Sequence, residues 1–123
     1  MGDAAARLFV HVVWAVHGRH PAIIAARDPL LHERLRLEAA KLRSKLVAVG
    51  SADDHVHVLA DLHRSVALAT LVQQLKGATA RAWNVDRLEP PLRWQVGYWA
   101  ESVSPDDIEP VAGYGAYVPK RNY

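Results

Sequence analysis

The sequence LVAVGSADDHVHVLAD, which covers residues 46–61, predicts a β-hairpin. Two runs rich in apolar and β-branched residues, Leu46–Val49 and Asp54–Asp61, are typical of strands, and Gly50–Asp54 between them has the composition of a turn. A connection this short places the two runs side by side as antiparallel neighbours. We therefore expect a sheet to be built around this hairpin.

The second strand of the hairpin carries two histidines, His55 and His57. Side chains alternate along a strand and residues two apart lie about 6.6–6.8 Å apart at Cα, so both imidazoles face the same side. One divalent ion can then contact both rings, while Val56 and Val58 face a core on the other side. The alternative is that the two histidines lie on the solvated face of a half-exposed sheet and bind nothing.

The rest of the chain extends the hairpin to the order β-α-β-β-α-β. Asp28-Pro29 and Ser65 are expected to begin helices, and Gly97 is expected to form a bulge in the last strand. This order predicts an α+β, ferredoxin-like fold with an antiparallel sheet, helices on one face and a C-terminal helix. The expected elements are strands at 8–16, 46–49, 54–61 and 94–103, helices at about 28–44 and 65–83, and a short helix from Ser104 to about residue 113–117.

The composition is typical of one soluble domain. The 123 residues are enough for a single hydrophobic core, so we expect one domain over residues 1–123. The absence of cysteine excludes disulfides, thiolate zinc sites and cysteine nucleophiles. The first residues do not resemble a signal peptide, and no apolar run approaches the roughly 20 residues of a membrane span, which predicts a cytoplasmic protein. The net charge of +2 selects no class of partner by itself.

Several segments together resemble the single-tyrosine HUH transposases of small bacterial insertion sequences and their relatives associated with repetitive extragenic palindromes (REP). The resemblance covers about residues 8–118, and its motifs are specific only in combination. The segments that carry it are His11–Ala15, Arg19–Pro21, Asp54–Leu59, Leu75–Gly77 and Trp94–Ser104, with Val111–Tyr114 after them.

The resemblance implies a transposase that nicks and joins single-stranded DNA containing hairpins. It implies that His55 and His57 hold a divalent metal, Mg²⁺ or Mn²⁺, against the scissile phosphate, and that Tyr114 attacks this phosphate to form a 5′-phosphotyrosine. Relatives are homodimers, and edge-strand pairing would give this chain the same assembly. The alternative for Tyr114 is an ordinary surface or packing tyrosine.

Four residues are candidates for contact with nucleic acid. Arg19 lies in a basic turn, and Lys76 precedes Gly77, a helical glycine that suggests close approach of DNA or of another backbone. Trp14 and Trp94, or Trp99, offer aromatic rings on which bases can stack.

One position departs from the family pattern. Relatives place a glutamine one helical turn after the tyrosine as the third metal ligand, but this chain has Val118 there, and valine cannot bind metal. Asp54, Asp61 or water could complete the coordination. Two alternatives to an active enzyme therefore remain: a nucleic-acid-binding or regulatory domain that has lost the chemistry, and an unrelated ferredoxin-like protein that binds a small molecule or metal.

Overall fold

The computed structural model describes residues 8–85 and 90–108. Within these residues the secondary structure follows the order β-α-β-β-α-β, as predicted. The strands are β1 (Leu8–Ala15), β2 (Lys45–Ser51), β3 (His55–Leu62) and β4 (Trp99–Val103), and the helices are α1 (Asp28–Lys41) and α2 (Leu68–Val85). Short 3-10 turns accompany them at η2 (His17–Arg19), η3 (Ala25–Arg27) and η4 (Pro105–Asp107).

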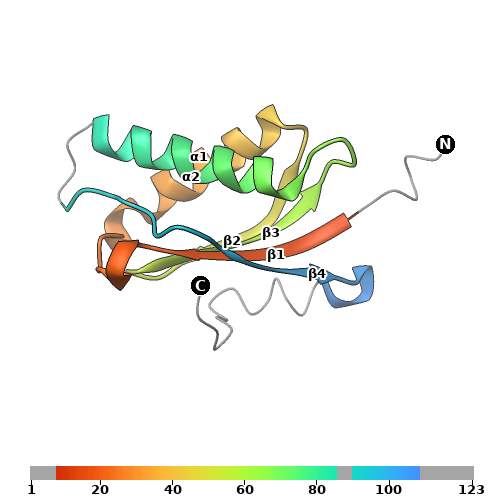
Figure 1. Cartoon of the computed structure of the whole chain (residues 1–123), viewed down its shortest axis with the longest axis horizontal. Coiled ribbons are helices and arrows are strands. Elements are labelled where there is room, and N and C mark those ends of the chain that lie inside the picture. Colours follow the sequence, from red (N-terminus) through yellow and green to blue (C-terminus); the bar gives the residue numbers. More distant parts are fainter. Residues whose placement is uncertain (1–7, 86–89, 109–123) are drawn as a thin grey trace.

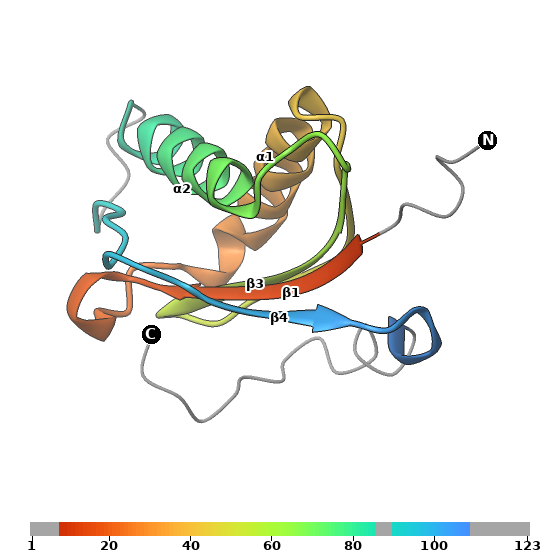
Figure 2. The same cartoon turned by 45° about the vertical axis from the view of Figure 1, so that its right-hand side comes forward.

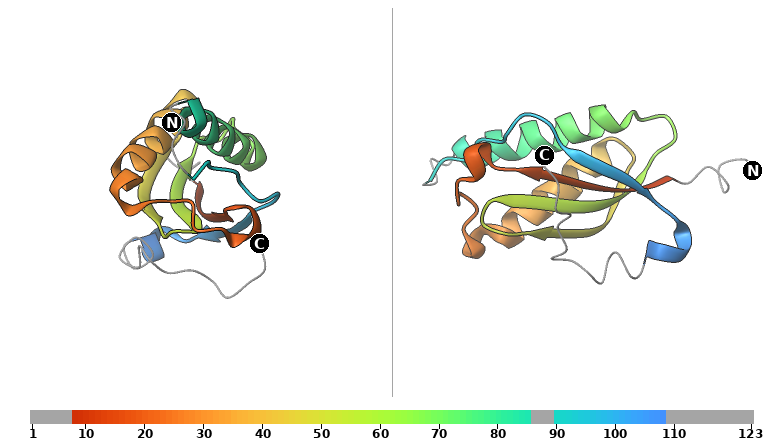
Figure 3. Two further views of the ribbon diagram at one scale, coloured as in Figure 1. Left: turned by 90° about the vertical axis from the view of Figure 1, so that its left-hand side faces the viewer. Right: turned by 60° about the horizontal axis from the view of Figure 1, so that its bottom comes forward.

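The strands form one antiparallel sheet in the order β2-β3-β1-β4. The two central strands pair along their whole length, from Leu8 opposite Leu62 to Ala15 opposite His55. Both helices lie on one face of this sheet (Figures 1 and 2), and Figure 3 shows the sheet obliquely from the other side. The arrangement confirms the predicted ferredoxin-like fold in the part of the chain that the structure describes.

The hydrophobic core lies between the sheet and the two helices. Every second residue of the two central strands points into it, so the residues between them, including His55 and His57, face away from the helices. Its members include Val10, Val12 and Trp14 of β1, Val56, Val58 and Ala60 of β3, Leu31 and Leu35 of α1, and Leu71 and Leu75 of α2.

α1 begins at Asp28, as predicted, whereas α2 begins at Leu68 and not at Ser65. Asp28 is the first residue of α1, and its carboxylate accepts a hydrogen bond from the Ser51 hydroxyl at the end of β2 (3.0 Å). Ser65 does not cap α2, because its hydroxyl and its backbone N–H both bind the Nδ1 atom of His63 (2.7 and 3.1 Å). Neither α1 nor α2 has the length and apolar character of a membrane span.

The last strand is shorter than predicted. Trp94 forms an isolated antiparallel bridge with Val16, and regular pairing with β1 resumes only in β4. Gly97 lies between the two paired parts with φ +94°, a conformation that favours glycine. The bulge predicted at Gly97 is therefore not observed: the glycine lies outside β4, at the break that divides the expected strand at 94–103.

The start of the predicted C-terminal helix is present as a single 3-10 turn. The Ser104 hydroxyl accepts a hydrogen bond from the backbone N–H of Asp106 (3.3 Å), which confirms Ser104 as the capping residue. Residues 109–123 lie outside the described part of the chain, and so do the predicted nucleophile Tyr114 and the departure at Val118.

Candidate metal site and nucleic-acid interface

His55 and His57 lie together on the face of the sheet opposite the helices. The register places His57 between Val13 of β1 and Gly50 of β2, and it places His55 opposite Ala15. Gly50 has no side chain and Ala15 has only a methyl group, so these neighbours crowd the two rings little. The two imidazoles share one face, as the two-residue spacing predicted; their binding of a metal stays a prediction.

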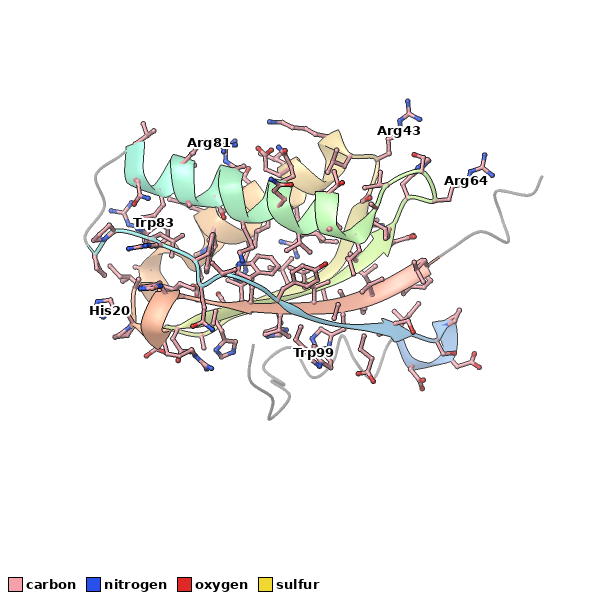
Figure 4. The ribbon with its side chains drawn as sticks, viewed as in Figure 1. His20, Arg43, Arg64, Arg81, Trp83 and Trp99 are labelled. Atoms are coloured by element: carbon pink, nitrogen blue, oxygen red, sulfur yellow. The ribbon has the colours of Figure 1, made fainter. Side chains whose placement is uncertain are left out.

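The two rings belong to a row of four aromatic side chains. His55 and His57 are nearly parallel, at 29° and 6.3 Å between ring centroids. His11 of β1 meets His57 edge to face at 5.9 Å, and Trp99 of β4 meets His11 in the same way at 5.5 Å. Trp99 lies on the side of the sheet away from the helices (Figure 4). His11 is thus a member of the cluster that the sequence does not single out, because only strand pairing brings it there.

His11 and His57 are buried, and burial favours the neutral form of these two histidines. Burial, together with the neighbouring His11 and His55, lowers the pKa of His57 to about 4. Burial also lowers the pKa of His11, against the opposing effect of Glu101. The His57 ring is therefore neutral at pH 7, and the neutral imidazole is the form that binds metal ions.

Asp54 connects this row to the turn at the end of β1. Its Oδ1 atom lies 2.8 Å from Nδ1 of His55, and its Oδ2 atom accepts a hydrogen bond from Nε of Arg19 (3.1 Å). Burial alone raises the pKa of Asp54, but the hydrogen bonds from His55 and Arg19 outweigh it and lower the pKa. Asp54 is therefore an ionised carboxylate at neutral pH. In the sequence, the feature that points to the contact between Asp54 and His55 is that the two residues are adjacent.

The structure does not support Asp54 or Asp61 as the third metal ligand. Both oxygens of Asp54 already bind other side chains. Asp61 lies four residues beyond His57 on the same strand, which corresponds to about 13 Å. Among residues 8–85 and 90–108, no group of three or more histidine or acidic side chains is arranged to hold an ion. Within this part of the chain, His55 and His57 remain the predicted metal ligands.

The prediction that Trp14 stacks on a base is wrong. Trp14 is 0% exposed, because it lies on the helix-facing side of β1 within the core. Its ring packs edge to face against Trp94 at 5.9 Å between centroids. A nucleobase cannot reach it without opening the fold.

Hydrogen bonds of Lys76 and Trp94 connect α2 to the chain before β4. The Lys76 ammonium donates hydrogen bonds to the backbone carbonyls of Gln95 (2.8 Å) and Gly97 (3.0 Å), and burial lowers the pKa of this lysine. In return, the Trp94 indole N–H donates to the backbone carbonyl of Lys76 (2.9 Å) and to the Thr79 hydroxyl (3.2 Å). These contacts fasten the chain before β4 to α2. Contact of either residue with nucleic acid stays a prediction.

Two other expectations from the sequence have different outcomes. Arg19 lies in η2 with its side chain 45% exposed, so part of it remains accessible while Nε binds Asp54. Close approach of another backbone to Gly77 is not observed: a Cβ atom built there would meet the end of the Arg81 side chain at 3.1 Å. The glycine in α2 is thus not required by backbone packing.

The chain matches a known family over most of its length. Residues 4–116 match the family model of IS200-like transposases. The ISDra2 transposase TnpA from Deinococcus radiodurans is 32% identical over 75 residues, which make up 61% of this chain and 54% of that protein. The chain therefore spans about half the length of this curated relative.

Solved structures of transposases resemble this one. A crystal structure of a candidate transposase from Deinococcus radiodurans R1 has a TM-score of 0.70 and 26% identity, over 88% of each chain. A REP-associated tyrosine transposase bound to a REP hairpin has a TM-score of 0.66 over 87% of this chain and 63% of that one; at 13% identity this shows a common fold. Because the family model extends across the histidine strand and the segment that contains Tyr114, this chain belongs to the IS200-like transposase family.

Proposed function

We propose that this protein nicks and rejoins single-stranded DNA that contains hairpins, with a divalent metal ion and a tyrosine nucleophile. The observation that carries the proposal is the pair of imidazoles, His55 and His57, side by side on one face of a rigid strand in a chain of the IS200-like transposase family. The hairpin bound by the structurally similar REP-associated transposase supports the choice of substrate.

The proposed ion is Mg²⁺ or Mn²⁺, as the resemblance to HUH transposases implies, and the described residues would supply two imidazole donors to it. A metal ion lies about 2 Å from an imidazole nitrogen, and the two ring centroids are 6.3 Å apart, a separation that one ion between the rings can span. A bound divalent cation would offset the negative charge of the scissile phosphate and of the leaving 3′-oxygen. His57 contributes by staying neutral, and therefore able to coordinate, throughout the physiological pH range.

In the proposed reaction Tyr114 is the nucleophile. Its hydroxyl oxygen forms a bond to the phosphorus of a backbone phosphodiester, and the bond between phosphorus and the 3′-oxygen breaks. The tyrosine loses its proton and the released 3′-oxygen gains one, which leaves a 5′-phosphotyrosine and a free 3′-hydroxyl. Attack by another 3′-hydroxyl reverses these steps and joins the strands, because the covalent ester conserves the bond energy.

Two further parts of the proposal concern contacts beyond the metal site. Arg19 is expected to contact the DNA backbone, and Trp99, half-buried at the edge of the histidine row, is the tryptophan best placed to stack on a base. We also expect a homodimer formed through an edge strand, since β2 and β4 are the outer strands of the sheet.

A second candidate function is a nucleic-acid-binding domain without catalysis. It is favoured by Val118, which replaces the glutamine ligand of relatives, and by the absence of a third ligand among the described residues. If mutation has removed the glutamine ligand from this chain, the substitution Val118→Gln should restore it and raise metal-dependent nicking activity. An unchanged rate would mean that another group already completes the coordination.

A nicking assay separates the two functions. Hairpin-containing single-stranded DNA is incubated with Mn²⁺ and one of three proteins: the wild type, Tyr114→Phe, or the matched control Tyr98→Phe. Covalent protein–DNA adducts are then resolved on a denaturing gel. The enzyme should give an adduct with the wild type and the control only. Tight binding with no adduct from any of the three proteins would contradict catalysis and support the binding domain.

A further inference from the structure

The Asp54 carboxylate is held on two sides by side chains that lie far apart in the sequence. Its Oδ1 atom meets Nδ1 of His55 at 2.8 Å, and its Oδ2 atom accepts from Nε of Arg19 at 3.1 Å. An ionised carboxylate can only accept hydrogen bonds, so the proton between Asp54 and His55 must be carried by Nδ1. A neutral imidazole with its proton on Nδ1 has an unprotonated Nε2 atom.

The backbone around Asp54 is fixed as well. The backbone N–H of Val16, the residue after β1, donates a hydrogen bond to the carbonyl of Asp54 (2.8 Å), and the backbone N–H of Ile23 donates to the carbonyl of Asp53 (2.9 Å). These bonds hold the turn before β3 against the segment that follows β1. The backbone of Asp54 is therefore fixed next to His55.

Arg19 adopts a backbone conformation that is costly for a residue with a side chain. Its φ is +57°, directly after Gly18 at φ +64°, and its backbone N–H donates to the carbonyl of Val16 (2.8 Å). Strained residues of this kind persist where the surrounding structure holds them, and they are common at functional sites. At Arg19 this conformation accompanies a side chain whose Nε binds Asp54.

We propose that Asp54 is a positioning residue for the metal site: it accepts the Nδ1 proton of His55 and so keeps Nε2 of that ring available as the ligand, while Arg19 holds Asp54 in place. Carboxylates that orient a ligating histidine in this way set its tautomer and raise its basicity. The inference rests on the proposed function, because it assigns Asp54 and Arg19 to the metal ion that His55 and His57 are proposed to bind.

The tautomer of His55 can be measured without metal or DNA. Long-range ¹H–¹⁵N correlation spectra of the metal-free protein at pH 8, above the usual histidine pKa of about 6.5, identify which ring nitrogen carries the proton. His55→Gln assigns the signals. We expect the proton on Nδ1 in the wild type and a shift toward Nε2 in Asp54→Ala. A wild-type ring protonated on Nε2, or a tautomer that Asp54→Ala leaves unchanged, would overturn the inference.

Metal affinity provides the second measurement. Titration with Mn²⁺, followed by the electron paramagnetic resonance signal of the free ion, should show affinity about 10–100-fold weaker in Asp54→Ala. Asp54→Asn keeps an acceptor oxygen and should lose less, and Arg19→Met, which keeps the aliphatic stem, should lose a few-fold. Asp53→Ala is the matched control, because this neighbouring carboxylate is exposed, and it should bind Mn²⁺ like the wild type.

The two measurements distinguish failure of this inference from failure of the proposed function. If His57→Ala binds Mn²⁺ as tightly as the wild type, the metal site and the proposed function fail together, whatever the tautomer. If His57→Ala loses Mn²⁺ but Asp54→Ala retains wild-type affinity, the metal site stands and the positioning role of Asp54 is wrong. Circular dichroism melting of each variant shows whether it is folded, and Asp54→Asn replaces Asp54→Ala if the latter does not fold.

Discussion

Two carboxylates in this molecule are each held by several donors, and their partners differ in kind. Glu38 of α1 is buried and accepts hydrogen bonds from Gln74 of α2 (2.7 Å) and from Lys41 (3.0 Å). Asp54 is held by Arg19 and His55. In both cases burial raises the pKa, while the hydrogen-bonding partners outweigh burial and lower it.

The difference lies in what the partner can do next. Lys41 and Gln74 both belong to the helix layer, and the hydrogen bond from Gln74 to Glu38 ties α2 to α1. An imidazole bound through Nδ1 still has Nε2, so the contact of Asp54 with His55 prepares a ligand. The same physical interaction is structural on the helix side of the molecule and, in our proposal, functional on the sheet side. Four substitutions or conditions test this division.

The largest effect is expected for His57→Ala, which removes one of two proposed ligands. Mn²⁺-dependent adduct formation should fall at least about 1000-fold, which corresponds to about 4 kcal/mol of transition-state stabilisation. The sequence alone predicts little effect on the fold. Because the ring is only 6% exposed, we instead expect the free energy of unfolding to fall by about 1–2 kcal/mol, measured in urea. Unchanged adduct yield would remove His57 from the site.

The second effect is a dependence of stability on pH. The pKa of His57 is about 4 in the folded chain and about 6.5 when unfolded, so between these values the unfolded state binds more protons. Stability should therefore fall as the pH drops from about 6.5 to 4, by up to about 3 kcal/mol. Urea unfolding at several pH values measures the slope. His57→Gln should flatten it, and an equally steep slope in that variant would assign the effect to other groups.

The third effect belongs to the structural carboxylate. Glu38→Ala removes the shared acceptor of Gln74 and Lys41 and should lower the free energy of unfolding by about 2 kcal/mol. Adduct yield per folded molecule should stay within about twofold of the wild type, since Glu38 lies on the helix side of the sheet. A specific loss of nicking without loss of stability would show that the two carboxylate clusters are not separate in function.

The smallest effect is expected at the helical glycine. Gly77→Ala should raise the free energy of unfolding by up to about 1 kcal/mol, because alanine favours the helix and the added Cβ meets only the mobile end of Arg81. Gly97→Ala is the matched comparison: at φ +94° it should lower stability by about 1 kcal/mol or more. A destabilised Gly77→Ala would indicate that Arg81 cannot move aside.

The sequence predicts the features that depend on local periodicity. The spacing of His55 and His57 is enough to place both rings on one face, because alternation along a strand is a property of the backbone. The turn-forming run before them is enough to predict the hairpin. Gly97 predicts only a bulge, whereas the structure shows a break in the strand there.

Features that depend on which face of a strand is buried, or on distant contacts, escape the sequence. β1 is apolar on both faces, so nothing in its pattern shows that Trp14 points into the core while His11 points to the histidine row. The hydrogen bonds of Lys76 to the segment before β4 join residues about twenty positions apart. From the sequence, the carboxylate of Asp54 is a candidate metal ligand. Only its observed contacts with His55 and Arg19 indicate that it positions His55 instead.

The most direct test of the metal site is pulsed electron paramagnetic resonance on the Mn²⁺-loaded protein, which detects nitrogen atoms bound to the ion. Two imidazole nitrogens should couple to Mn²⁺ in the wild type, one in His55→Ala or His57→Ala, and two in Asp53→Ala. A spectrum without nitrogen coupling in the wild type would show that the ion does not bind the histidine strand, and it would contradict the site on which the proposed function depends.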